Sequence, residues 1–333
     1  MLVVERTGYQ DWRPGESLAP SANTALAELG VAERLLELGW KRCLRIEACW
    51  GNYHPYAQDS IFDPYGAGVQ VERPRFDALL AAATAKAGAA LALESRLLRL
   101  ERCAEGWYAT LASSGREHRR RVRFVVDATG RQAVLARRIG AKRRTIDRLI
   151  GLVGLYENST ADIVDSTLLV EAVEGGWWYS APLVGALVVA FMTDADLLRG
   201  PERVTPEGFR DRLACAPLTS ARVDGFSLSQ LRVRSAASSW LRQVTGEGWL
   251  AVGDAAAAHD PLAGAGLTRA IDSGLRAGQA LAAALDGDGQ ATARYAHETA
   301  LSCQAYEHQR AEIYGRERRW PSSPFWARRT VVD

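Results

Sequence analysis

The sequence predicts an α/β protein that carries an inserted antiparallel sheet. Three observations predict this class. Short apolar runs alternate with helical patterns in the first and last parts of the chain, as in a parallel sheet covered by helices. Long β-rich runs follow one another between residues 149 and 194, which is typical of an antiparallel sheet. Residues 249–252 form a short apolar run that leads into a glycine-rich turn and a helix.

The composition is that of an ordinary globular protein. Of the 333 residues, 47% are hydrophobic and 24% are charged, so the chain can bury one large core or two packed ones. The formal net charge of +2 is too small to indicate a nucleic-acid partner, and we expect the basic runs 119–121 and 316–319 to face solvent. No apolar run approaches the roughly 20 residues that span a bilayer, so no membrane association is expected.

The five cysteines are odd in number and scattered along the chain. They form no C-x-x-C pair and no Cys/His cluster at zinc-ligand spacing. This pattern predicts a reduced, cytoplasmic protein without a metal site.

The chain opens on a short β-branched strand, residues 2–4, which Glu5 closes before a glycine-containing turn. In dinucleotide-binding folds, an acid in this place follows a Gly-x-Gly-x-x-Gly turn by about 20 residues and binds a ribose hydroxyl. Here the first strand, the glycine-rich turn and the helix that the unit places ahead of such a strand do not precede residues 2–4. We therefore expect roughly 25 to 30 residues of the usual unit to be absent, as in a truncated gene model.

Helices and strands alternate after this opening. Apolar residues at helical spacing predict two short helices within residues 17–38, separated by Gly30. Strand-like runs follow near residues 43–50 and 68–71. Residues 73–87 form an alanine-rich helix, because Pro74 suits its first turn and a glycine follows its end.

The middle of the chain is rich in strands. Apolar or alternating runs near residues 91, 97–103, 107–111 and 122–126 predict strands, and the last of them ends in VVDATGR. The runs LIGLVGLYE, STLLVEAV, GGWWYSAPL and ALVVAFMTD then predict the inserted antiparallel sheet. A short Val184-Gly185 link predicts a hairpin between the last two of these runs. A helix from about residue 267 and a long helix over 291–318 complete the chain.

Residues 253–266 carry the strongest chemical signal. The stretch joins a strand end at Gly-Asp, a loop with Pro261 and a Gly-Ala-Gly turn that opens a helix. Glycines let the backbone approach a flat ligand closely, and the free N–H groups of a helix N-terminus attract an electron-rich edge. The carboxylate of Asp254 can accept protons from the hydroxyls of a polyol. A glycine-rich helix start is nevertheless a weak signal when it stands alone.

The stretch GDAAAAHDPLAGAGL resembles the flavin-contacting signature of FAD-dependent monooxygenases and halogenases of the p-hydroxybenzoate hydroxylase fold. Further stretches agree with this family in order and spacing. They are Glu5, RPGES at residues 13–17, ERPRFDALL at 72–80 and VVDATGR at 125–131. The resemblance covers essentially the whole chain, and it implies a Rossmann-like FAD-binding domain that lacks its first strand and helix, with an antiparallel substrate-binding sheet.

The resemblance also implies the extents of these parts. The FAD-binding domain takes residues 1–148, which include part of the substrate sheet near 43–71, and then residues 236–290. Residues 149–235 supply the antiparallel substrate sheet. Residues 291–333 form a C-terminal helical segment.

By the same resemblance, several residues bind FAD. Glu5 contacts the adenosine ribose, Asp254 the ribityl chain, and Arg73 the ribityl or the pyrophosphate, while Arg13 lies near the flavin. The turn that faces the pyrimidine edge of the flavin comprises Pro261, Gly264, Ala265, Gly266 and Leu267. Surface ion pairing is the alternative for the two arginines. Asp260 and His259 adjoin the ring site and are weak catalytic candidates, and a simple loop histidine is the better interpretation of His259.

The absent Gly-x-Gly-x-x-Gly unit has a predicted consequence. Without it, neighbouring strands lack a partner and the pyrophosphate loses a helix N-terminus. The chain as given is then expected to bind FAD poorly or not at all, whereas a form with that unit binds it. Equal flavin content in the visible spectra of the two purified forms would contradict this hypothesis.

The resemblance implies an aromatic hydroxylase that works through a flavin C4a-hydroperoxide. A halogenase of the family carries a W-x-W-x-I-P segment and a tunnel lysine; this chain has no such segment, and Lys41, expected in a turn, is a poor substitute for the lysine. ACWGNY, IFDPYGAG, GGWWYSAPL and ERRWPSSPFW resemble a subgroup that matures quinone cofactors by oxygenating a Trp of a partner protein. Either Trp178, or Trp177 with Tyr179, lines a pocket if that strand is regular, although sheet-core packing is the stronger alternative.

The sequence leaves three alternative functions open. They are a geranylgeranyl-reductase-like enzyme, a halogenase and a non-catalytic fragment unable to hold FAD. The chain has no second dinucleotide fingerprint, so electrons are expected from a transiently bound nicotinamide or a separate flavin reductase. The substrate is an aromatic small molecule or a Trp-containing protein.

Overall fold

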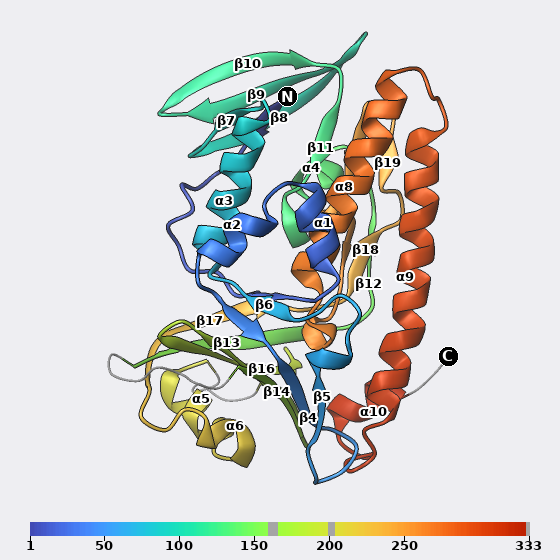
Figure 1. Ribbon diagram of the computed structural model, residues 1–333. Helices are drawn as coiled ribbons and strands as arrows, with labels where there is room; N and C mark the ends of the chain where they lie inside the picture. The colour runs from blue at the N-terminus through green and yellow to red at the C-terminus, as the bar shows by residue number, and fades with distance from the viewer. Residues whose placement is uncertain (159–165, 199–203, 331–333) are drawn as a thin grey trace.

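The computed structural model describes residues 1–158, 166–198 and 204–330. Two sheet regions are stacked along the long axis in Figure 1, with the C-terminal helices running beside both of them. The α/β class with a large, mostly antiparallel sheet is the class that the sequence predicts.

Two pairs of parallel strands form the upper region. β1 (Leu2–Val4) pairs with β7 (Ala90–Ala92), and β11 (Val125–Asp127) pairs with β20 (Trp249–Ala251), which is followed in the sheet by β19 (Thr245–Gly246). Among the described residues, β1 pairs only with β7, and β11 pairs only with β20. One edge of β1 and one edge of β11 are therefore unpaired. The strand and glycine turn expected ahead of Glu5 stay a prediction.

The large sheet has seven strands in the order β17-β13-β16-β15-β14-β4-β5. Their bounds are β4 Arg45–Cys49, β5 Tyr56–Asp59, β13 Leu149–Glu157, β14 Thr167–Val173, β15 Gly176–Leu183, β16 Ala186–Asp194 and β17 Ser227–Ser235. The β15–β16 hairpin turns at Val184-Gly185, as the sequence predicts. β14 pairs with β4 in parallel, so the sheet is not purely antiparallel.

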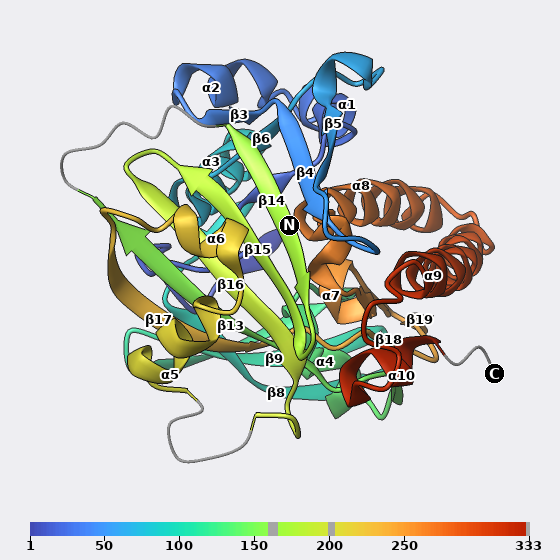
Figure 2. The ribbon, with the colours of Figure 1, turned by 90° about the horizontal axis from the view of Figure 1, so that it is seen from below.

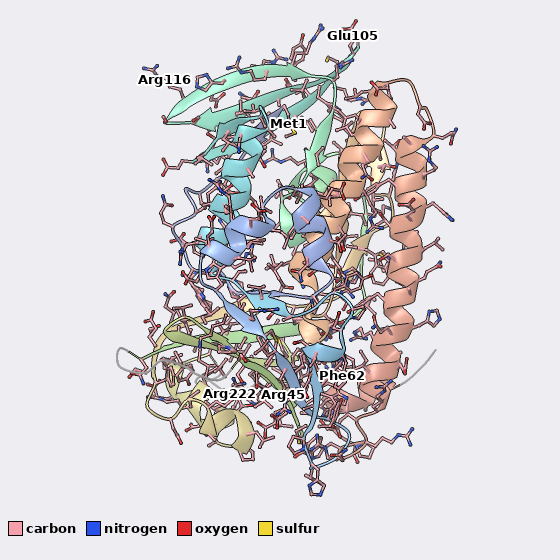
Figure 3. The ribbon with its side chains drawn as sticks, in the orientation of Figure 1. Met1, Arg45, Phe62, Glu105, Arg116 and Arg222 are labelled. Atoms are coloured by element: carbon pink, nitrogen blue, oxygen red, sulfur yellow. The ribbon has the colours of Figure 1, made fainter. Side chains whose placement is uncertain are left out.

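Three small sheets complete the strands. Their members are β10-β9-β8, β12-β18-β21 and β2-β6-β3. The bounds are β2 Ser17–Leu18, β3 Lys41–Cys43, β6 Gly68–Gln70, β8 Ser95–Cys103, β9 Gly106–Ser113, β10 Arg116–Val122, β12 Arg143–Thr145, β18 Ser239–Leu241 and β21 Ala257–Ala258. The basic run 119–121 lies on exposed β10 and pairs with Glu101 and Glu105, which confirms that it faces solvent. The same prediction for 316–319 is wrong at Arg319, whose side chain is buried against Glu317. Glu105 and Arg116 lie at opposite ends of the β10-β9-β8 sheet in Figure 3.

Ten α-helices and three 3-10 turns are present in the described ranges. The helices are α1 Ala22–Glu28, α2 Ala32–Glu37, α3 Arg73–Lys86, α4 Val134–Arg138, α5 Pro206–Leu213, α6 Pro217–Ala221, α7 Gly253–Ala256, α8 Gly266–Leu285, α9 Ala291–Gly315 and α10 Pro324–Thr330. The turns are η1 Ser60–Phe62, η2 Gly130–Gln132 and η3 Pro261–Ala263. No helix in the described part of the chain is both long and apolar enough to cross a membrane.

Several predicted boundaries are wrong. Residues 17–18 form a strand rather than helix, because Leu18 is buried and pairs with Val69 of β6. Within the segment 43–71, β4 and β5 join the large sheet, and β6 belongs to the small β2-β6-β3 sheet. Lys41 begins strand β3 and does not lie in a turn. The long C-terminal helix ends at Gly315, three residues earlier than predicted.

The large sheet is buried on both faces. Its inner face, toward α8 and α9, packs Trp50, Trp177 and Val188 against Tyr314 and Trp326. Its outer face packs another cluster under α5 and α6. Figure 2, seen from below, shows α5 and α6 lying over the strands on the side away from α8. The alternation of side chains along each strand therefore fills two separate cores.

Candidate functional site

The turn that connects β20 to α8 presents bare backbone. Gly264 adopts a left-handed φ of 59°, which an L side chain rarely adopts. A Cβ atom added at Gly264 or Gly266 would meet no heavy atom within 4 Å, so open space adjoins this turn. The first N–H groups of the 20-residue helix α8 lie here and have no partner within the helix. The turn can therefore take the flat, electron-rich edge of a ring.

Asp254 is held at the start of α7 by two arginines. Arg131 approaches its carboxylate, with Nε 3.3 Å from Oδ2. Arg143 donates to the backbone carbonyls of Asp254, at 2.6 Å, and Ala255, at 3.2 Å. Burial raises the pKa of Asp254. Four guanidinium groups oppose that rise, those of Arg131, Arg143, Arg73 and Arg269.

Glu5 lies at the other end of the site, directly after β1. Its Oε1 accepts hydrogen bonds from the Thr7 amide at 2.9 Å and the Thr7 hydroxyl at 2.6 Å. Arg13 Nη2 lies 3.5 Å from the same oxygen. The other carboxylate oxygen of Glu5 makes no hydrogen bond that we can assign in the described residues, so it can accept from a ligand hydroxyl.

Asp77 of helix α3 links the two predicted arginines. Its Oδ2 lies 3.6 Å from Arg13 Nη1 and 3.1 Å from Arg73 Nη2, and Arg73 Nε donates to Oδ1 at 3.1 Å. Arg73 Nη1 also donates to the Pro14 carbonyl at 3.3 Å. Ion pairs therefore join Glu5, Arg13, Asp77 and Arg73, and the charge of Arg73 opposes the raised pKa of Asp254.

This line of residues suits a dinucleotide. A carboxylate stands at each end, where it can accept hydroxyl protons, and guanidinium groups lie between them, where they can offset the charge of a diphosphate. The Asp254 side chain is 37% exposed and that of Glu5 is 23% exposed, so both remain accessible. The open turn at Gly264 and Gly266 adds space for a ring. The residues present thus fit FAD.

Asp260 is fully engaged in a buried network. Tyr314 Oη donates to its Oδ2 at 2.6 Å, and the Leu262 amide donates to its Oδ1 at 2.8 Å. Its own amide donates to Tyr306 Oη at 2.8 Å. Trp177 Nε1 of the large sheet donates to Tyr314 Oη at 3.0 Å. Asp260 therefore fixes the loop between β21 and α8 against the inner face of the sheet, which favours a positioning role over acid catalysis.

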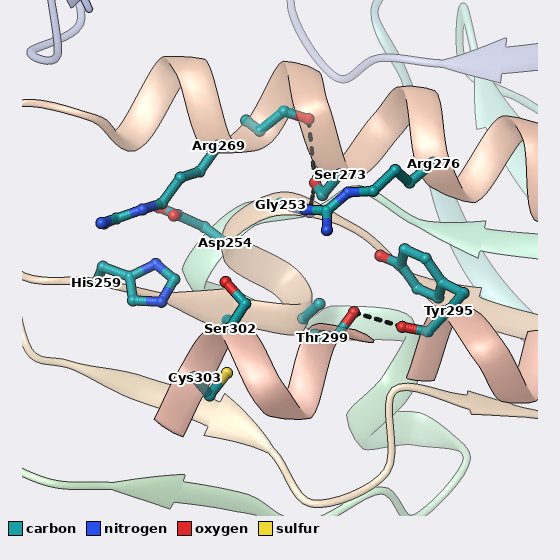
Figure 4. A pocket seen from close by; sticks show the side chains of 13 residues that line it. Gly253, Asp254, His259, Arg269, Ser273, Arg276, Tyr295, Thr299, Ser302 and Cys303 are labelled. Carbon is teal, nitrogen blue, oxygen red and sulfur yellow. Dashed lines mark hydrogen bonds between the residues drawn. The ribbon is translucent and has the colours of Figure 1, made fainter. Parts of the chain in front are cut away.

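His259 faces a small pocket behind the turn. The pocket, about 40 Å³ in volume, lies between α7, α8 and α9, so it has space for water rather than for a flavin ring. Figure 4 shows Arg269 of α8 reaching past Asp254 toward the His259 ring, with Ser302 and Cys303 of α9 on the other side. His259 Nε2 is buried and has no hydrogen-bond partner among the described residues.

The ring of His259 makes stability depend on pH. Burial, followed by the charges of Arg269 and Arg131, lowers the pKa of His259 from 6.5 to about 3. The unfolded chain gains a proton on this ring below about pH 6.5, whereas the folded chain stays neutral, so stability is lost as the pH falls toward 3. We expect the wild type to lose about 1.4 kcal/mol more per pH unit below about 6 than the His259→Gln variant.

Urea unfolding at about pH 6 and pH 5 measures this difference. His297→Gln, at an exposed position of α9, is the matched control and should follow the wild type. If the free energy of unfolding falls equally in the wild type and in His259→Gln, His259 does not titrate in this way.

The aromatic strand β15 presents its side chains to both faces of the sheet. Trp177 and Tyr179 face inward, where Tyr179 Oη donates to the buried Glu16 carboxylate at 2.5 Å. Burial raises the pKa of Glu16. Trp178 faces outward and stacks on Phe191 with ring centroids 4.8 Å apart. The predicted alternation is confirmed, and Trp177 with Tyr179 is the pair on the side of the turn.

Sequence reasoning did not single out several residues of this site. Arg131 lies within the quoted VVDATGR stretch, and Asp77 lies one turn after Arg73, where an i,i+4 ion pair is expected on a helix. Glu16 lies within the quoted RPGES stretch, but its bond to Tyr179 joins segments that are far apart in sequence. No local signal marks Arg143 or Arg269.

Comparisons with known proteins show the family to which the chain belongs. A family model described as an FAD binding domain matches residues 15–310. The putative FAD-dependent oxidoreductase LodB of Marinomonas mediterranea is 28% identical over 99% of this chain and 89% of its own length.

Solved structures show the same fold at low identity. The myxobacterial chondrochloren halogenase CndH, an FAD-dependent halogenase, superposes with a TM-score of 0.87 at 21% identity and covers 100% of this chain and 80% of its own. The peptidyl tryptophan dihydroxylase QhpG, essential for tryptophylquinone cofactor biogenesis, has a TM-score of 0.79 at 22% identity, over 98% of this chain and 77% of its own. Since the family model spans most of the sequence, the chain belongs to the FAD binding domain family and is an FAD-dependent oxidoreductase.

Proposed function

We propose that the protein is a monooxygenase that hydroxylates an aromatic ring, the indole of a Trp side chain in a partner protein. One observation carries this proposal: the turn assigned to the flavin packs directly on an aromatic sheet face. Leu262 of the turn and Tyr179 of β15 are half-buried against the same cluster, which contains Trp177 and Tyr314. A flat apolar substrate bound beside this contact would meet aromatic and aliphatic side chains.

The proposed cofactor contacts follow the line of residues described above. Glu5 binds the adenosine ribose, Asp254 the ribityl hydroxyls, and Arg73 the region between them. Arg13 is proposed to act beside Glu5, because its guanidinium lies between Glu5 and Asp77. Pro261, Gly264, Ala265, Gly266 and Leu267 form the turn at the pyrimidine edge.

Reduced FAD supplies oxygen activation when it is bound. In the balanced reaction, one atom of O₂ enters the substrate ring and the other leaves as water, with two electrons from a nicotinamide through a separate flavin reductase. The contribution of the protein is to position the ring and to exclude water. Trp177, Tyr314 and Asp260 serve both tasks, because they fix the turn on a dry sheet face.

One similarity supports a protein-bound indole as the substrate. QhpG, a peptidyl tryptophan dihydroxylase, shares the fold over 98% of this chain. The stretches ACWGNY and GGWWYSAPL, which resemble the subgroup that matures quinone cofactors, also support this substrate.

Halogenation is the second candidate, because CndH superposes closely on this chain. The sequence argues against it. W-x-W-x-I-P is absent, and the only lysines are Lys41, Lys86 and Lys142. Lys41 lies on β3, in the small sheet with β2 and β6, and neither of the other two lies in the line of residues from Glu5 to Asp254.

The test uses the purified protein with FAD, a flavin reductase, a reduced nicotinamide, chloride and a Trp-containing peptide. Mass spectrometry should show a peptide that gains oxygen only, with uptake of O₂ that depends on the peptide. A matched peptide with Phe in place of Trp should remain unchanged. Incorporation of halogen would support the halogenase instead, and O₂ uptake without peptide modification would contradict hydroxylation of Trp.

A further inference from the structure

A second and larger cavity lies away from the flavin turn. Its volume is about 650 Å³, within the range of roughly 300–1,000 Å³ found for sites of small organic ligands. The tip of the β14–β15 hairpin, the α5–α6 segment and residues 319–320 surround it.

This cavity lies at the hairpin end of the large sheet. Glu171 and Trp178 of the outer face line it, and so do Ala172, Leu197 and Trp320, which belong to the inner cluster or pack against it. None of the described residues in the line from Glu5 to Asp254 lines the cavity. The cavity and the proposed FAD site are therefore different sites.

The walls of the cavity are mostly apolar and aromatic. Trp178 and Phe191 stack to form one wall, and Leu198 and Leu218 line it from the neighbouring segments. Trp178 Nε1 is a buried donor without a hydrogen-bond partner in the described ranges. Such walls favour a flat aromatic body.

The charged groups of the walls are not equally satisfied. The Glu171 carboxylate accepts from the Leu218 amide at 3.2 Å and from the Thr219 amide and hydroxyl, each at 2.7 Å. Arg319 donates to Glu317 at 2.6 Å and to the Cys49 carbonyl at 3.2 Å. Both of these buried charges are therefore compensated.

The charge of Arg212 is not compensated by a carboxylate in the described residues. Its one assigned hydrogen bond goes from Nη1 to the Gly208 carbonyl at 2.7 Å, and it pairs with no carboxylate in the described part of the chain. Glu174 is exposed at the rim, at the tip of the hairpin. A guanidinium with free donors beside apolar walls suits a planar carboxylate, which it can bind through two parallel hydrogen bonds.

We propose that this cavity is a binding site for an aromatic carboxylate, with Arg212 holding the carboxylate and with Phe191, Leu198 and Leu218 contacting the ring. The site is independent of the proposed hydroxylation, because it shares no residue with the line from Glu5 to Asp254. It is present whether or not the enzyme acts on Trp.

The probe is 2-naphthoate, titrated into the purified protein by isothermal titration calorimetry. Arg212→Gln should weaken binding about 10- to 100-fold, the expected effect of losing a charged hydrogen bond. Arg210→Gln is the matched control, because Arg210 lies on the same helix and pairs with Glu207 on the surface. The neutral analogue 2-naphthamide should bind at least about tenfold more weakly than the acid.

Two further measurements separate this site from others. Leu218→Trp, which fills the cavity, should abolish binding while its thermal unfolding stays close to that of the wild type. Saturating FAD should leave the affinity for 2-naphthoate unchanged. The proposal is overturned if the wild type does not bind 2-naphthoate, if Arg212→Gln and Arg210→Gln bind it equally, or if FAD competes with it.

Discussion

Replacing Asp254 by alanine is expected to weaken FAD binding about 10- to 100-fold, because a carboxylate that accepts ligand hydroxyls contributes about 1.5–3 kcal/mol. The variant also leaves Arg131 without the carboxylate that lies 3.3 Å from its Nε. Quenching of FAD fluorescence on titration with protein measures the affinity. Asp254 is proposed as a ribityl ligand, and this is the single substitution expected to reduce cofactor affinity most.

Asp211→Ala serves as the matched control. Asp211 is an exposed carboxylate on α5, on the outer side of the large sheet, so its removal should leave FAD affinity unchanged. If Asp254→Ala and Asp211→Ala bind FAD equally well, Asp254 is not a cofactor ligand and the proposed placement of FAD fails.

The largest loss of stability is expected for Asp194→Ala. The Asp194 side chain is 3% exposed and that of Arg329 is 2% exposed, with Nη2 2.5 Å from Oδ1 and Nη1 3.1 Å from Oδ2. Desolvation of the guanidinium is more than offset by Asp194, which raises the pKa of Arg329. Truncation would leave a buried positive charge without its partner, which costs about 3–5 kcal/mol.

Asp196→Ala provides a contrast within the same cluster. Asp196 pairs with Arg328 at 2.8 Å, but its side chain is 38% exposed. Solvent screens such a pair, so its loss should cost at most about 1 kcal/mol. Urea unfolding of both variants measures the two free energies. Equal losses would mean that the Asp194–Arg329 pair contributes no more than a surface ion pair.

The sequence predicts most of the fold because local patterns determine it. The helix over 73–87 begins at Arg73 and ends at Lys86, since Pro74 suits the first turn and Gly88 adopts a left-handed φ of 92° after the end. The runs of the large sheet form β13 to β16 within a residue of their predicted bounds. β-branched and aromatic residues in long runs have few alternatives to a buried strand.

Elements whose pairing is remote in sequence are less predictable. β10 carries three consecutive arginines and no apolar alternation, so only its pairing with β9 identifies it as a strand. The parallel pair of β4 with β14 joins residues more than 100 positions apart, and no turn chemistry indicates it. The division into four segments, at 148, 235 and 290, stays a prediction.

The candidate site also has residues that the sequence marks and residues that it does not. Ion pairs through Asp77 join Glu5, Arg13 and Arg73, and the charge of Arg73 opposes the raised pKa of Asp254. Their roles toward FAD stay proposals. Motifs mark residues that belong to one strand end or helix start, whereas the charges that surround them come from the tertiary structure.

The contacts of helix α9 have a consequence for how the protein unfolds. Three of its tyrosines bond to different parts of the structure: Tyr295 to the Ala251 carbonyl of β20, Tyr306 to Ser238 and the Asp260 amide, and Tyr314 to Asp260 and Trp177. One continuous helix therefore ties the upper strands to the large sheet. Detaching it would expose both cores together, so we expect the two regions to melt in a single cooperative transition, with no half surviving as a separate folding unit.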